Sequence, residues 1–265
     1  MLNIIRRLAI QHRSFLLACC LLLFVFQVVV AAIIASLDLS RTLEGFLTFA
    51  PPAIRAIIEQ TMPGGSTAGI LAFTWNHPVT HALITAIAIT FGARAIAGEI
   101  ENGAIELILT HPLSRVNYLA AHILFALMSM AFVVLVGLLG AVVGERAFGL
   151  EPFAWDRLLR LSGNLLLLQM SFYSLTLLCS AFGREGGRVA VLAVLIAIIS
   201  YLDNVIATLW SKAAFLRPYS FHTYYDPREI LVNGNLGTWP LAVLGVFTLA
   251  AIGVAFARFL TRDLP

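Results

Sequence analysis

The sequence predicts an all-α integral membrane protein with six transmembrane helices, and three observations support this. Of the 265 residues, 60% are hydrophobic and only 12% are charged, and the mean hydropathy is +0.92. A soluble domain carries about 25% charged residues and could not bury this much apolar surface. Disorder requires the opposite composition. The apolar residues also gather into six runs of the length that crosses a bilayer, without the alternation of barrel strands.

The first run, residues 14–37, follows the basic residues Arg6, Arg7 and Arg13. Its apolar stretch is longer than the core of about 7–15 residues that is typical of a cleaved signal peptide. We therefore expect this run to be retained as the first transmembrane helix.

Five further runs predict spans that, with the first, make one transmembrane domain over residues 1–265. The expected ranges are 73–97, 116–143, 158–182, 189–209 and 239–259. An even number of spans places both termini on one side of the membrane. The segments on that side are short and dense in arginine, so the positive-inside rule predicts cytoplasmic termini in a bacterial inner membrane.

The longer connections on the other side carry apolar and aromatic residues. Those around Pro51 and Pro52 predict two short amphipathic helices at the membrane surface. The aromatic residues between the fifth and sixth runs indicate either an interfacial belt or a hairpin that dips back into the membrane. Asp226 and Pro227 have the pattern of an N-cap and first helical position, which predicts a short helix through Leu231.

The segment 98–115, between the second and third spans, is the most informative stretch. Apolar residues recur at helical spacing from Ile100, and Pro112 disfavours continuation of the helix beyond residue 111. The pattern predicts a short helix along the inner surface that begins at Glu99. Amphipathicity alone allows either a simple interfacial connection or a docking surface for a soluble partner.

This segment resembles the type-2 exporter class of ABC transporter permeases, especially small six-span permeases such as the nitrous-oxide-reductase maturation permease. The matching residues are Gly98, Glu99, Glu101, Gly103, Leu107, Leu109, Pro112 and Arg115. The similarity extends over essentially the whole chain. It implies a non-catalytic permease that forms a dimer, with a homodimer expected, in which each copy docks one cytosolic ATPase subunit. The coupling residues expected from it are Glu99, Glu101, Gly103, Ile105, Glu106, Leu109, Pro112 and Arg115.

The expected cofactors, ATP and Mg²⁺, would belong to the partner ATPase, and none is expected in this chain. A phosphate-binding loop needs glycines followed by lysine and a hydroxyl residue. The only lysine, Lys212, follows Leu209, Trp210 and Ser211. The scattered arginines give no pattern for nucleic-acid binding, so the lipid bilayer, the ATPase and a second permease copy are the expected partners.

Two sets of polar residues are candidates for a substrate pathway. Gln169, Tyr173 and Thr176 share one face of the fourth span. Such groups either bond neighbouring helices or line a path through the membrane. Asp203 lies in the outer part of the fifth run, where it is either a buried functional carboxylate or a hydrated residue near the helix end.

Small residues and histidines raise two further alternatives. Gly137, Gly140 and Gly144 predict close packing of the third span against another helix. His77 and His81 are four residues apart at the start of the second span. They could share a metal ion, or they could simply begin the helix.

Two other functions compete with an exporter permease. An intramembrane hydrolase would need a nucleophile–base pair or a metal triad at membrane depth. The sequence has no HExxH motif and no serine framed by glycines within a span. A membrane anchor for other subunits is the second alternative, and the identity of a transported substrate stays open.

Overall fold

The computed structural model describes residues 1–36, 48–51, 67–103 and 114–262. All the regular structure in these ranges is helical, and six helices are long and apolar enough to cross a membrane. This confirms the predicted all-α membrane protein. The spanning helices are α1 (Leu2–Ser36), the continuous helix Pro78–Glu101, α8 (Arg115–Phe148), α9 (Trp155–Phe182), α10 (Gly186–Leu209) and α12 (Thr238–Thr261).

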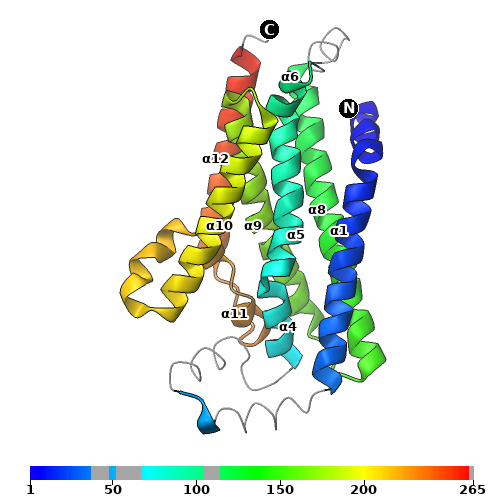
Figure 1. Cartoon of the computed structure of the whole chain (residues 1–265), viewed down its shortest axis with the longest axis vertical. Helices are drawn as coiled ribbons and strands as arrows, with labels where there is room; N and C mark the ends of the chain where they lie inside the picture. Colours follow the sequence, from blue (N-terminus) through cyan, green and yellow to red (C-terminus); the bar gives the residue numbers. More distant parts are fainter. Residues whose placement is uncertain (37–47, 52–66, 104–113, 263–265) are drawn as a thin grey trace.

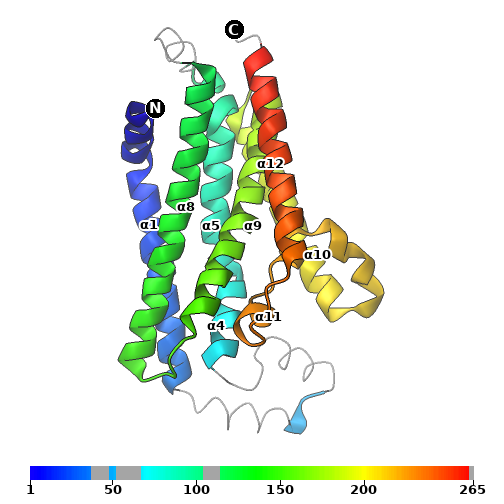
Figure 2. The same cartoon turned by 180° about the vertical axis from the view of Figure 1, so that it is seen from behind.

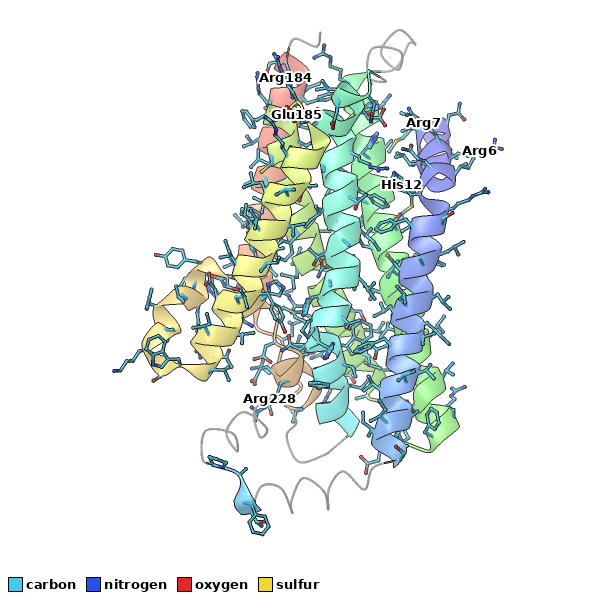
Figure 3. The ribbon with its side chains drawn as sticks, viewed as in Figure 1. Arg6, Arg7, His12, Arg184, Glu185 and Arg228 are labelled. Atoms are coloured by element: carbon cyan, nitrogen blue, oxygen red, sulfur yellow. The ribbon has the colours of Figure 1, made fainter. Side chains whose placement is uncertain are left out.

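The six helices run side by side as one bundle, and both chain ends lie at the same end of it (Figure 1). We call this the terminal end and the opposite one the far end. Arg7, Arg184 and Glu185 lie at the terminal end, whereas Arg228 lies at the far end (Figure 3). An even number of membrane crossings between the two termini accounts for this arrangement.

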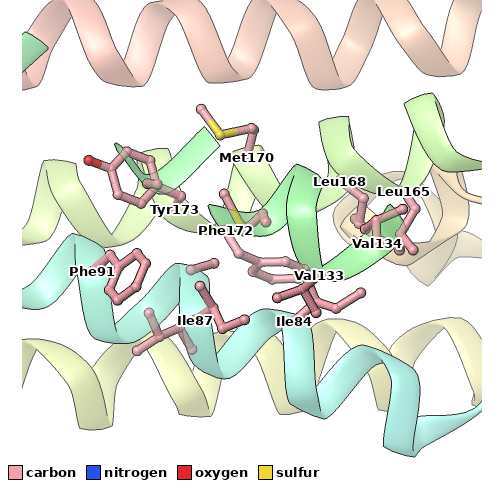
Figure 4. Close-up of a cluster of buried hydrophobic side chains, with 14 of the residues drawn as sticks. Ile84, Ile87, Phe91, Val133, Val134, Leu165, Leu168, Met170, Phe172 and Tyr173 are labelled. Carbon is pink, nitrogen blue, oxygen red and sulfur yellow. The ribbon is translucent and has the colours of Figure 1, made fainter. Parts of the chain in front are cut away.

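Helix α9 forms the centre of the bundle, with α5 (Pro78–Ala93) and α12 packed against it and α1 packed against α8 (Figure 2). Large side chains from three helices fill the centre, among them Ile84, Val133 and Phe172 (Figure 4). In contrast, only 22% of the apolar window of α10, and of α12, is buried. The bundle therefore presents these two helices most openly to lipid or to another chain.

The three glycines of α8 allow α1 to approach it closely. A Cβ atom on Gly140 would lie 2.7 Å from the backbone oxygen of Phe24, and one on Gly144 would lie 2.5 Å from Cβ of Ala31. Gly137 faces Leu23 in the same way. The prediction of close packing by small residues is thus confirmed, and the helix that they face belongs to the same chain.

The second span differs from its expected range at both ends. Phe73 belongs to a separate helix, α4 (Thr67–Asn76), and the span begins after His77. At the terminal end the helix continues through a π-helical turn, η2 (Arg94–Gly98), into α6 (Glu99–Glu101). A helix beginning at Glu99 was therefore a wrong prediction. Nothing before residue 102 breaks the helix; Gly103, at a φ of 66°, ends it instead.

The segment between α10 and α12 folds back along α10. Two 3₁₀ helices follow α10. The first, η3 (Ser211–Tyr219), projects from the side of the bundle (Figure 1), and the second, η4 (Phe221–Tyr224), packs against α9, α10 and α12. Ser220 Oγ then lies 3.2 Å from Ser200 Oγ, well inside α10. This return favours the hairpin alternative over a simple interfacial belt.

The short helix predicted from Asp226 and Pro227 is confirmed as α11 (Pro227–Leu231). The Asp226 carboxylate accepts a hydrogen bond from the Glu229 amide at 3.1 Å, as an N-cap does. The two amphipathic helices expected around Pro51 and Pro52 lie almost wholly outside the described residues.

Candidate functional site

Glu99 is a buried carboxylate in the last turn of the second span. It is 8% exposed, and its Oε2 lies 3.2 Å from Nη2 of Arg7 on α1. A charge at such a position needs a partner because its desolvation is costly. Glu99 thus ties the second span to the first within the chain.

Glu101 binds a different helix, although it is only two residues further along. Its Oε2 accepts a hydrogen bond at 2.8 Å from the backbone amide of Gly186, the first residue of α10. This carboxylate supplies the cap that the free amides of a helix N-terminus require. Of the other predicted coupling residues, Ile105, Glu106, Leu109 and Pro112 lie outside the described residues.

Arg115, the last predicted coupling residue, caps the end of α12. Its guanidinium Nη1 donates to the carbonyl oxygens of Phe259 at 3.1 Å and Arg262 at 2.7 Å. Arg262 in turn donates to the carbonyl oxygen of Ala181 at 2.9 Å. These bonds join the start of α8, the end of α12 and the end of α9 at the terminal end.

Two adjoining cavities lie beside α10. One, of about 320 Å³, lies between α5 and α10 near the middle of the bundle, and the other, of about 360 Å³, lies between α4, α10 and α11 toward the far end. Both lie in the range of roughly 300–1,000 Å³ that is typical of small-molecule pockets. They share three lining residues: Pro78, Tyr201 and His222.

The two cavities differ in polarity. The one near the middle of the bundle has a largely apolar wall, formed by Ala82, Ala86, Ile89, Val194, Ala197 and Ile198. The cavity nearer the far end is bordered by polar groups, including Asn76, His77, Asn204, Thr223, Asp226 and Arg228. Together they form a groove, which we call the α5–α10 groove, with an apolar middle part and a polar mouth toward the far end.

A sequence model of ABC-2 family transporter proteins matches residues 7–264. The chain belongs to the ABC-2 transporter family. This confirms the resemblance to type-2 ABC permeases and makes the chain a multi-pass membrane subunit of an ABC transporter. A search of curated proteins finds no match to this ABC-2 permease.

In the ABC-2 permease, histidine and tyrosine rings form the boundary between the two cavities. The rings of His81 and His222 are 4.9 Å apart, and those of His222 and Tyr201 are 5.3 Å apart. His222 Nδ1 lies 3.0 Å from Ser200 Oγ. Burial, and then the His81 ring, hold the pKa of His222 well below its ordinary value, so this imidazole is neutral.

His77 begins the second span of the permease. Its Nδ1 accepts a hydrogen bond from the Val79 amide at 3.2 Å, as expected of a histidine at a helix start. His81 is 4% exposed, and neither of its ring nitrogens has a partner among the described residues. Sequence reasoning recognised this pair but missed His222 and Tyr201. Tyr201 reaches the groove through the packing of α10 against α5, and His222 reaches it through the return of the hairpin along α10.

The polar face of α9 lies behind the groove of the permease. Gln169, Tyr173 and Thr176 have no exposed surface. Thr85 Oγ1, which borders the groove, donates to Gln169 Oε1 at 2.9 Å. Gln169 and Thr176 contact α5, the first through Thr85 and the second beside Gly92. Thr85 thereby links this polar face of α9 to the groove wall.

Asp203 lies within α10, which continues beyond it to Leu209, and its side chain is half-buried. The helix therefore does not end near Asp203. The neighbouring residue Asn204 lines the polar mouth of the groove. Asp203 occupies the same level of the permease, close to the far end of α10.

Proposed function

We propose that this chain is the permease half of an ABC exporter. Two copies form the pathway, and each docks a cytosolic ATPase that binds ATP and Mg²⁺. The family match over residues 7–264 carries this proposal. The shared end of both termini, with Arg6, Arg7, Arg184 and Arg188 near it, supports a cytoplasmic placement of the terminal end.

The ATPase docks on the connector, residues 102–114, which joins the second and third spans. Glu99 and Glu101 bind Arg7 and Gly186 within the chain, so their role is to position the start of the connector. Contact with the ATPase then belongs to the remaining predicted residues: Ile105, Glu106, Leu109 and Pro112. A charge pair in a desolvated interface costs about 2–5 kcal/mol when one partner is truncated.

The α5–α10 groove is the proposed substrate pathway. Its apolar middle part and polar mouth favour an amphipathic substrate, with Thr85, His81 and Tyr201 along the wall. Gln169 supports the wall through Thr85. A second permease copy packed near the exposed face of α10 would close the groove from the lipid side, and Asp203 would then lie near the exit.

Co-purification tests the docking part of the proposal. The permease is co-expressed with candidate ABC ATPases from the same genome and purified through a tag on the permease. Glu106→Ala and Leu109→Asp should each reduce the retained ATPase at least tenfold. The control is Lys212→Ala at the far end, which should retain it fully. Full retention by both connector variants would refute docking through this segment.

A further inference from the structure

The π-helical turn η2 holds one more residue per turn than an α-helix, and it lies immediately before Glu99. In an α-helix the Ala97 amide would donate to the Ala93 carbonyl. Here the hydroxyl of Ser180, from α9, stands between them. Ser180 Oγ accepts from the Ala97 amide at 2.8 Å and donates to the Ala93 carbonyl at 3.1 Å.

A second helix satisfies another group of the same turn. The hydroxyl of Tyr118, on α8, donates to the Ala95 carbonyl at 3.0 Å. Ser180, Ala95 and Ala97 have no exposed surface, and Tyr118 is 1% exposed. Because backbone groups in a bilayer need internal partners, these two hydroxyls stabilise a turn that would otherwise leave buried groups unpaired.

The π-turn sets the direction of every residue that follows it. An α-helix rotates by about 100° per residue. If the turn closed to an α-helix, the segment beyond it would rotate by about this angle. Glu99 would then leave Arg7, and Glu101 would leave the amide of Gly186.

The neighbouring helix leaves little room for intermediate positions. A Cβ atom on Gly186 would lie 2.9 Å from Cα of Gly98, so the two backbones are nearly in contact. Packed elements of this kind occupy discrete arrangements rather than a continuous range. If the hydroxyl were expelled, the second span would have to take a distinct second form at this point rather than an intermediate one.

We propose that Ser180 is a positioning residue that holds the inner end of the second span in the π form. In the isolated permease, the π-turn then fixes the direction in which the second span enters the connector. In the transport cycle, the same turn acts as a joint at which this direction changes. The second part rests on the proposed function, whereas the first concerns the isolated permease alone.

A cross-link in the isolated permease tests the positioning role. Asn102 and Gly187 line the same cavity of about 510 Å³ beside η2, and a side chain at Gly187 would meet open space. With Cys19, Cys20 and Cys179 replaced by alanine, the pair Asn102→Cys and Gly187→Cys is joined by a short bis-methanethiosulfonate. Ser180→Ala should reduce the yield at least fivefold, and Ser180→Thr, which keeps the hydroxyl, should preserve it.

A deletion shows whether Ser180→Ala acts through the π-turn or through general destabilisation of the permease. Removal of Ala97 takes out the extra residue of the π-turn. A regular α-helix can then reach Glu99 without the Ser180 hydroxyl, and Glu99 keeps its present orientation. Deleting Ala97 in the Ser180→Ala background should therefore restore the cross-link, whereas deletion of Ala86, in a regular turn of α5, should not. An unchanged yield in Ser180→Ala, or no rescue by the Ala97 deletion, would overturn the positioning role.

The ATPase complex tests the joint in the transport cycle. ATP with vanadate should change the cross-link yield at least threefold in the complex with wild-type Ser180, and should leave it unchanged once Ala97 is deleted. An equal response of the cross-link yield in the two complexes would overturn the proposal that the π-turn acts as a joint. Failure of the ATPase to bind at all would refute the proposed function, while the cross-link in the isolated permease still decides the role of Ser180.

Discussion

Replacement of Gly140 by valine should destabilise the permease by separating α1 from α8. A Cβ atom there would lie 2.7 Å from the Phe24 oxygen and 3.1 Å from its Cα. Both atoms belong to the backbone, so α1 itself must move. Overpacking of this kind costs about 1–3 kcal/mol, which exceeds the few tenths that valine gains over glycine in helix propensity.

A matched control is available on α9. Nothing lies within 4 Å of a Cβ atom on Gly163, so Gly163→Val should leave stability unchanged or slightly raised. Thermal unfolding can be followed with a thiol-reactive dye, because Cys19 and Cys20 are buried. For Gly140→Val we expect a fall of about 2–10 °C, at about 2–4 °C per kcal/mol. Equal melting temperatures for the two variants would refute the close contact of α1 with α8.

Three further predictions use the same assay. Arg7→Ala should cost about 1–2 kcal/mol, a modest value because Arg7 is 47% exposed, and Glu99→Leu should recover part of it; additive losses would argue against the pair. Asp226→Ala should cost about 0.5–2 kcal/mol by uncapping α11, and Asp226→Asn should cost less. Burial lowers the pKa of His222 below its ordinary value of 6.5, so the unfolded chain protonates first. Stability should fall as the pH drops below about 6.5, less steeply in His222→Gln.

The sequence was sufficient to predict the spans because each apolar run must satisfy its own backbone in lipid. The cap at Asp226 and the glycine face of α8 were also predictable, because each depends on residues that are close together in the chain. The π-turn was not predictable. It depends on the hydroxyl of Ser180, 83 residues after Ala97, and no local pattern reports that approach.

In the candidate site, too, the features set by nearby residues were predictable and those set by distant residues were not. Amphipathicity and family resemblance led to Glu99 and Glu101, but they indicated the wrong environment for Glu99, because its burial depends on Arg7 from another helix. The groove escaped prediction because Tyr201 meets His81 only through the packing of α10 against α5, and His222 meets it only after the hairpin folds back along α10. Long-range packing, rather than periodicity, decides where these side chains lie.

The mass and ATPase activity of the purified assembly test the central claim most directly. The permease is co-expressed with the ABC ATPase that co-purifies with it, reconstituted in lipid nanodiscs, and measured both as the assembly and alone. We predict two copies of this chain with two ATPase subunits, ATP hydrolysis by the assembly, and none by the permease alone. A permease that elutes without the ATPase, or that hydrolyses ATP by itself at a transporter-like rate, would contradict the account.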